Sequence, residues 1–205
     1  QLAFQNRINS DKEFADAWDR EIGRIEKEML SNQIEKHLVP LDVYAYNYSV
    51  KKLLAFKAII PLFGNHQKKN TDSKSSAETY VTTSDGKVTG IIDLIQESND
   101  GIDIIDYKTG SILDKYSSDK PKDEYVLQIK IYAALYHDMH GEWPMKLMLI
   151  GINSEHFSID VDSTECSNLL IQVKRTLDNI NEQIEAGLQP EEFAQPSPEA
   201  CLYCL

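Results

Sequence analysis

The sequence predicts an α/β fold in which a mixed central sheet is flanked by helices and preceded by a helical N-terminal segment. Apolar residues recur at helical spacing in the first third of the chain. In the middle of the chain, apolar and polar residues alternate as in β-strands, on both sides of two turn signals. Apolar residues at helical spacing return after this region. A sheet covered by helices is the simplest layered arrangement of such segments. The 205 residues suit a single domain, over residues 1–205, with a sizeable core.

The helical N-terminal part is expected to span residues 1–63. Its first helix begins near Ser10 or Asp11, and a second helical segment ends at Pro61. The polar residues 64–77 are expected to form a mobile loop. The apolar stripe of the first helix is expected to lie in the core. The stripe consists of Phe14, Trp18, Ile22, Ile25 and Met29.

Residues 78–162 are expected to form the catalytic core of the domain. Turn signals at residues 84–86 and 98–101 separate three strand-like runs, which favours an antiparallel meander. The segments expected after it are a polar crossover over residues 111–124, a helix over about 124–140, strands around 146–151 and 156–161, and a C-terminal helix with a cysteine tail over 163–205.

Composition and charge exclude several classes of protein. No apolar run approaches the ~20 residues that span a bilayer, and the chain does not start with a secretion signal, although Gln1 suggests that a longer chain was trimmed. The net charge of −12 disfavours a broad phosphate-binding surface, so any contact with nucleic acid must be local or assisted by a metal. Cys166, Cys201 and Cys204 make a poor disulfide framework and favour the cytoplasm.

The run GIDIIDYKTG, residues 101–110, carries charges where a buried strand should be most apolar. Asp106 and Lys108 are two residues apart, so they point to the same side of the strand, and Tyr107 points to the other. Taken alone, such a pair is most simply a structural ion pair. The preceding strand carries Asp93, and the turn between the strands would bring it close to opposite Asp106.

Two converging carboxylates with a single lysine favour a divalent cation. Two carboxylates close together raise the pKa of one of them unless a cation neutralises their charge. Hard oxygen ligands that leave positions open for water suit Mg²⁺ or Mn²⁺. A lysine beside such an ion can orient a water, help to deprotonate it, and stabilise charge that develops on a phosphate. The alternative is a purely structural domain, in which the three charges form a closed ion-pair network without metal.

The runs GIIDLI, IIDYKTG thirteen residues later, and QIKIY together resemble the PD-(D/E)xK nuclease superfamily, in its RecB-like exonuclease branch, over residues 78–151. The resemblance implies a restriction-endonuclease-like core that hydrolyses DNA phosphodiesters with a metal ion. It also implies single-stranded DNA ends as the substrate and a helicase as the partner, in repair or recombination. The alternative is a nuclease-derived domain that binds DNA or a protein partner without cutting.

The resemblance also assigns the residues of the candidate site. Asp93, in the G-x-x-D setting that starts at Gly90, and Asp106 would hold the metal. The backbone carbonyl of Tyr107 would be a further ligand. Lys108 would be the catalytic lysine of the D-x-K pair.

Four further candidates follow from the same resemblance. Gln128 and Tyr132 match the Q-x-x-x-Y of the family's next helix, and their spacing of four puts both on one helical face. Glu78 resembles an acid that many relatives carry at the start of this sheet. Relatives also carry a metal-ligating histidine in a G-x-x-x-H motif, which this sequence lacks, and His37 is a candidate for its place.

The tail PSPEACLYCL resembles the cysteine motif that closes an iron–sulfur site in AddB-like nucleases. Cys201 and Cys204 would supply two of the four thiolates of a [4Fe-4S] cluster in a longer protein. Cys166 does not fit the motif. The cluster is therefore expected to be empty in this chain.

Overall fold

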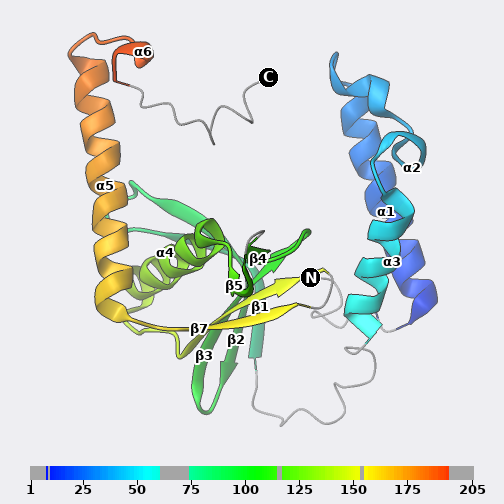
Figure 1. Cartoon of the computed structure of the whole chain (residues 1–205), viewed down its shortest axis with the longest axis horizontal. Coiled ribbons are helices and arrows are strands. Elements are labelled where there is room, and N and C mark those ends of the chain that lie inside the picture. The colour runs from blue at the N-terminus through cyan, green and yellow to red at the C-terminus, as the bar shows by residue number, and fades with distance from the viewer. Residues whose placement is uncertain (1–7, 9, 61–73, 115–116, 153–154, 194–205) are drawn as a thin grey trace.

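The computed structural model describes residues 8, 10–60, 74–114, 117–152 and 155–193 (Figure 1). Its centre is a five-stranded sheet in the order β1-β2-β3-β6-β7, in which β3 and β6 run parallel and the other neighbours antiparallel. This architecture confirms the predicted fold class and the predicted meander. The strands are β1 (Lys74–Thr82), β2 (Thr89–Ser98), β3 (Gly101–Lys108), β6 (Lys146–Gly151) and β7 (His156–Asp160).

Two long helices complete the main core. α4 (Asp123–His140) connects β3 to β6 and packs on the sheet, and α5 (Ser163–Glu185) packs against α4 (Figure 1). The Asp162 carboxylate caps α5, because it accepts hydrogen bonds from the first free backbone N–H groups of the helix. Apolar side chains from all these elements meet in one core, which includes Val81, Ile92, Ile104, Ile129, Leu147, Leu149 and Leu170.

Two boundaries differ from the sequence prediction. Residues 74–77, predicted as the end of a loop, belong to β1 and pair with β2. They are polar because β1 is an edge strand of the sheet, where side chains that face solvent are tolerated. The predicted polar crossover contains a short hairpin formed by β4 (Leu113–Asp114) and β5 (Ser117–Pro121). Strands this short leave no alternating pattern in a sequence.

The N-terminal helices pack around a small apolar cluster of their own. Phe14 is buried in this cluster, whereas Ile22, Ile25 and Met29 are only half-buried. The prediction that the whole stripe lies in the core is therefore wrong. Helical spacing shows that side chains share a face, but burial depends on what packs against that face. The helices are α1 (Asp11–Leu30), a 3₁₀ turn η1 (Glu35–Leu38), α2 (Leu41–Tyr44) and α3 (Tyr48–Ile59).

Only the first half of α5 has a buried face. Cys166 and Leu170 are buried, but Ile180 and Ile184 are 36% and 55% exposed. Figure 1 shows the second half of α5 extending past α4 toward the short α6 (Pro190–Phe193). Among the helices in the described ranges, none is both long enough and apolar enough to cross a membrane.

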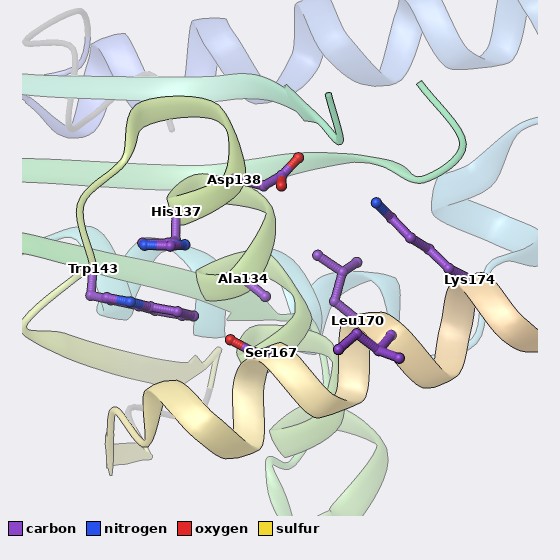
Figure 2. A pocket seen from close by; sticks show the side chains of 8 residues that line it. Ala134, His137, Asp138, Trp143, Ser167, Leu170 and Lys174 are labelled. Atoms are coloured by element: carbon purple, nitrogen blue, oxygen red, sulfur yellow. The ribbon is translucent and has the colours of Figure 1, made fainter. Parts of the chain in front are cut away.

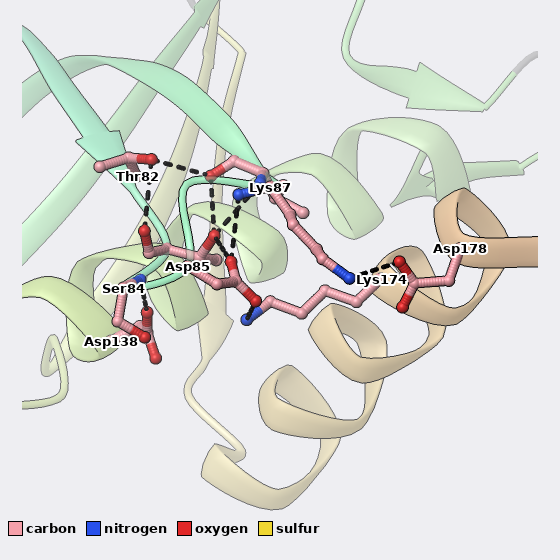
Figure 3. A network of polar contacts seen from close by, with 9 residues as sticks. Thr82, Ser84, Asp85, Lys87, Asp138, Lys174 and Asp178 are labelled. Carbon is pink, nitrogen blue, oxygen red and sulfur yellow. Dashed lines mark hydrogen bonds and ion pairs between the residues drawn. The ribbon is translucent and has the colours of Figure 1, made fainter. Parts of the chain in front are cut away.

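The turn between β1 and β2 is tied to both long helices (Figure 3). The Asp85 carboxylate accepts a hydrogen bond from the Thr83 hydroxyl and pairs with Lys174 of α5 at 3.0 Å. Hydrogen bonding, first from Thr83 and then from Lys174, lowers the pKa of Asp85. The backbone N–H of Ser84 donates to Asp138 of α4 at 2.6 Å. These contacts fix the start of β2 relative to α4.

Candidate active site

Two carboxylates meet where the ladder between β2 and β3 ends. The last pair at this end is Leu94 with Ile105, so Asp93 and Asp106 are the next residues on the two strands. Oδ2 of Asp93 accepts a hydrogen bond from the backbone N–H of Tyr107 at 2.8 Å. The Asp93 carboxylate thus accepts the hydrogen bond that a backbone carbonyl of β2 would accept in a regular ladder. Asp93 also lies near Asp106, as the turn spacing predicts.

An irregularity in β1 lies at the same level of the sheet. The residues on either side of Glu78 pair regularly with β2, which leaves Glu78 across from Asp93 without a regular partner. Glu78 has a φ of 50°, in the left-handed region that residues other than glycine rarely adopt. Its side chain is exposed. Asp93 therefore lies outside the regular ladder on both sides, a feature that the sequence pattern did not predict.

Asp106 is the buried acid of the site. The residue is 3% exposed, and its Oδ2 lies 2.7 Å from Nζ of Lys108. Burial raises the pKa of Asp106 most strongly, the nearby charge of Asp93 raises it further, and Lys108 opposes both without cancelling them. One ammonium group therefore does not balance the two carboxylates, and an additional cation would favour the ionised form of Asp106.

A chain of hydrogen bonds leads from the buried acid to α4. Nζ of Lys108 donates to Oε1 of Gln128, and Nε2 of Gln128 donates to the Tyr132 hydroxyl at 2.9 Å. Gln128 and Tyr132 are one helical turn apart, so they share the face of α4 that meets the end of β3. The structure thus brings together the five residues that the sequence singled out as catalytic, namely Asp93, Asp106, Lys108, Gln128 and Tyr132.

Tyr125 is a member of this site that the sequence reasoning missed. Nζ of Lys108 lies 4.7 Å from the centroid of the Tyr125 ring, within the range of a cation–π interaction. Tyr125 precedes Gln128 by three residues on α4, so both side chains reach the same lysine. That spacing is visible in the sequence, but the direction of the lysine side chain is not.

Gly90 gives Tyr132 the space that it needs. A Cβ atom at position 90 would lie 2.9 Å from Cε1 of Tyr132 and 3.3 Å from Cδ1 of Leu135. The Tyr132 ring therefore packs directly on the backbone of β2, three residues before Asp93. This contact joins the G-x-x-D and Q-x-x-x-Y motifs in space.

Replacing Gly90 by Ala should displace the Tyr132 ring and loosen the chain from Tyr132 through Gln128 to Lys108. We expect a loss of about 1–3 kcal/mol in the free energy of unfolding, the usual cost of overpacking. Urea denaturation measures it. Gly110→Ala is the matched control, since a Cβ atom at Gly110 would meet nothing within 4 Å. Equal stability of the two variants would show that the Gly90 contact is unimportant.

Two further residues that the sequence analysis considered, His37 and Cys166, do not join this site. His37 lies exposed in η1, among the N-terminal helices. Burial raises the pKa of the Cys166 thiol to about 11, which disfavours the thiolate that binds metals. Cys201 and Cys204 lie outside the described residues. Within the described ranges, no three His, Cys, Asp or Glu side chains gather as a metal site.

A small pocket lies apart from these residues, between α4 and α5 (Figure 2). The His137 ring stacks on Trp143 at one end, with 4.1 Å between their centroids. Asp138 and Lys174 lie at the other end, where both hold the β1–β2 turn. The pocket contains none of the predicted site residues, and its two charged side chains already have partners.

Comparison with known proteins places the chain in a family. The family model of the PD-(D/E)XK nuclease superfamily matches residues 7–205. No protein of curated function is significantly similar in sequence. Among solved structures, the chain is similar to a protein designated SSO0001, with a TM-score of 0.40 and 19% identity over 90% of this chain and 77% of the other. It is also similar to a putative exonuclease from Eubacterium rectale, with a TM-score of 0.42 and 16% identity over 76% of this chain and 65% of the other. On the strength of the family match, which spans nearly the whole sequence, the chain belongs to the PD-(D/E)XK nuclease superfamily.

Proposed function

We propose that this chain is a metal-dependent deoxyribonuclease of the cytoplasm, which hydrolyses phosphodiester bonds at Asp93, Asp106 and Lys108. The observation that carries the proposal is the position of Lys108 between Asp106 and Gln128, next to a second carboxylate. A structural ion pair would need one acid for one lysine. A surplus acid beside a lysine that is held in place suits a metal ion and its substrate better.

Mg²⁺ or Mn²⁺ fits the donor set of the site. The carboxylates of Asp93 and Asp106 and the backbone carbonyl of Tyr107 are hard oxygen donors, which these ions prefer. Glu78 lies across from Asp93 and is a further candidate ligand. A bound ion would make a water more acidic and neutralise charge on a phosphate.

The chain's own residues have separate tasks in the proposed reaction. Lys108 orients the attacking water and stabilises negative charge that grows on the phosphate oxygens. Gln128 accepts a hydrogen bond from Lys108 and so fixes the direction of its ammonium group. Tyr132 holds Gln128 in turn. The Lys108 ammonium group is thus oriented before the substrate arrives, which lowers the free-energy cost of reorganising the site during the reaction.

The substrate that we propose is the end of a single DNA strand, cut in repair or recombination beside a helicase. The RecB-like motifs in the sequence support this choice. The net charge of −12 also supports it, because an acidic chain holds DNA poorly over a wide surface. A partner such as a helicase would then supply most of the contacts with DNA.

A second candidate function is a nuclease-derived domain that binds DNA or a protein without cutting. The observation in its favour is the small ligand set, since no three His, Cys, Asp or Glu side chains in the described residues are grouped closely enough to hold a metal ion. The intact chain from Asp106 to Tyr132 argues against it, because binding alone does not require an oriented lysine.

End-labelled single strands separate the two functions. With Mn²⁺ the protein should shorten the strand progressively from an end, and chelation of the metal should stop the reaction. Strands labelled at either end, together with a closed circular strand, report the polarity and the need for an end. Binding without any cleavage, in Mn²⁺ and in Mg²⁺, would replace the nuclease with the second candidate.

The cysteine tail remains a separate proposal. We infer that Cys201 and Cys204 contribute to an iron–sulfur cluster only together with two further thiolates, since such clusters need four. The purified 205-residue chain should therefore be colourless and contain little iron. Iron in amounts equal to the protein would show that the chain holds a complete ligand set.

A further inference from the structure

Two lysine side chains share the ring of Tyr125. Nζ of Lys108 lies 4.7 Å from the ring centroid and Nζ of Lys122 lies 5.0 Å from it. Lys122 directly precedes α4, and Tyr125 stands in the first turn of that helix. The ring packs partly against the main core, so it is a firm support for both ammonium groups.

Lys122 differs from the other half-buried lysines in the described part of the chain. Each of the others pairs with a carboxylate at 3.0 Å or less, whereas no carboxylate of the described residues lies within 4.0 Å of the Lys122 ammonium group. The cation–π contact with Tyr125 does not neutralise the charge of Lys122, so its ammonium group can still bind an anion. The paired lysines are Lys52, Lys108, Lys130 and Lys174.

The surroundings of Lys122 suit a phosphate group. Lys122 is the N-cap residue of the 18-residue helix α4 and makes no side-chain capping bond, so its backbone stands at the positive end of the helix dipole. Asp123 and Glu124 also lie in this turn, but both are exposed and neither pairs with Lys122. In a chain of net charge −12, this is a local cation held next to the candidate catalytic lysine.

We propose that Lys122, supported by the ring of Tyr125, binds a backbone phosphate of the DNA strand next to the phosphate that is cut. The inference rests on the proposed function, because it takes Lys108 to face the reacting phosphate. Lys122 then contributes to substrate affinity and to the position of the strand, while Lys108 acts on the reaction itself. A contact with a backbone phosphate carries no base preference.

The salt dependence of binding tests this assignment. Affinity for a labelled single strand is measured over a range of KCl concentrations, with Ca²⁺ in place of Mn²⁺ to prevent cleavage. Lys122→Ala should lower the slope of log K against log[salt] by about 0.7, the value for one phosphate contact on a single strand. The change should fall on Kd and KM rather than on the single-turnover rate at saturation.

Variants at Tyr125 and Lys120 serve as controls. Tyr125→Phe keeps the ring and should keep the salt slope of the parent. Tyr125→Leu removes the ring and should lower the slope as Lys122→Ala does. Lys120→Ala removes an exposed lysine two residues away and should change nothing. Thermal melts confirm that each variant is folded.

If Lys122→Ala keeps the salt slope of the parent, or loses only cleavage rate and no affinity, the phosphate assignment is wrong. The proposed function still stands in that case, provided that the parent cleaves the strand. A parent that neither binds nor cuts the strand overturns both.

Discussion

Replacing Asp106 by Asn should weaken Mn²⁺ binding by more than about a hundredfold and abolish DNA cleavage. Changes to groups that merely orient a metal ligand already cost about 10–100-fold in affinity, so the loss of a ligand should cost more. Asn keeps the size of the side chain but not the charge, and the surplus negative charge at Asp93 and Asp106 is what favours a cation. Isothermal titration calorimetry with Mn²⁺ measures the loss directly.

Asp103→Asn is the matched control for this experiment. Asp103 lies on the same strand, three residues before Asp106, and is also partly shielded from solvent. It is paired by register with Gln96 and Lys146, away from the end of the ladder. Its replacement should leave Mn²⁺ affinity at the parental value. Unchanged affinity in Asp106→Asn would remove this residue from the metal site.

The stability of the metal-free variant separates a metal site from a structural ion pair. Because the pKa of Asp106 is raised in the folded protein, its contribution to stability is present at acid pH and is lost as the pH rises through that folded pKa. At pH 7 without metal, Asp106→Asn should therefore melt no lower than the parent. A clearly lower Tm would mean that the ion pair with Lys108 stabilises the fold.

The sequence was sufficient to predict the approach of Asp93 to Asp106. A short turn fixes the register of two neighbouring strands, and register determines which residues meet. It was not sufficient to predict how Asp93 is freed from the ladder. On the β1 side, the missing pair coincides with the left-handed conformation of Glu78, and glutamate carries no local signal for such a conformation.

The helical stripes show the opposite limit of sequence reasoning. Spacings of three and four correctly located α1 and α5, because the period of a helix is a local property. They did not show that Met29 would be only partly buried and Ile184 exposed, since burial depends on another element that covers the helix face. The same reasoning explains why Lys122 was overlooked, because its contact with Tyr125 depends on side-chain direction.

Replacing Lys108 by Ala should leave metal binding nearly intact while lowering the hydrolysis rate by roughly a hundredfold or more. This is the usual cost of one lost donor that is positioned for the transition state. Lys108 stands at the end of β3 and its side chain is 14% exposed, so the strand should fold without it. A bound metal ion would then provide the positive charge that Asp106 loses. The measurement is single-turnover cleavage of a labelled single strand with Mn²⁺ at saturating protein.

Lys130→Ala provides the control for a lost lysine of similar burial. The Lys130 side chain is 13% exposed and pairs with Glu165 at 2.6 Å, on α4 but away from the two carboxylates. Its replacement should leave the cleavage rate at the parental value. The variants at Lys108 and Lys122 should also differ in kind, since the first lowers the rate at saturation and the second lowers affinity. If Lys108→Ala cuts as fast as the parent, the ammonium group of Lys108 has no part in the reaction, and its hydrogen bond to Gln128 serves only the structure.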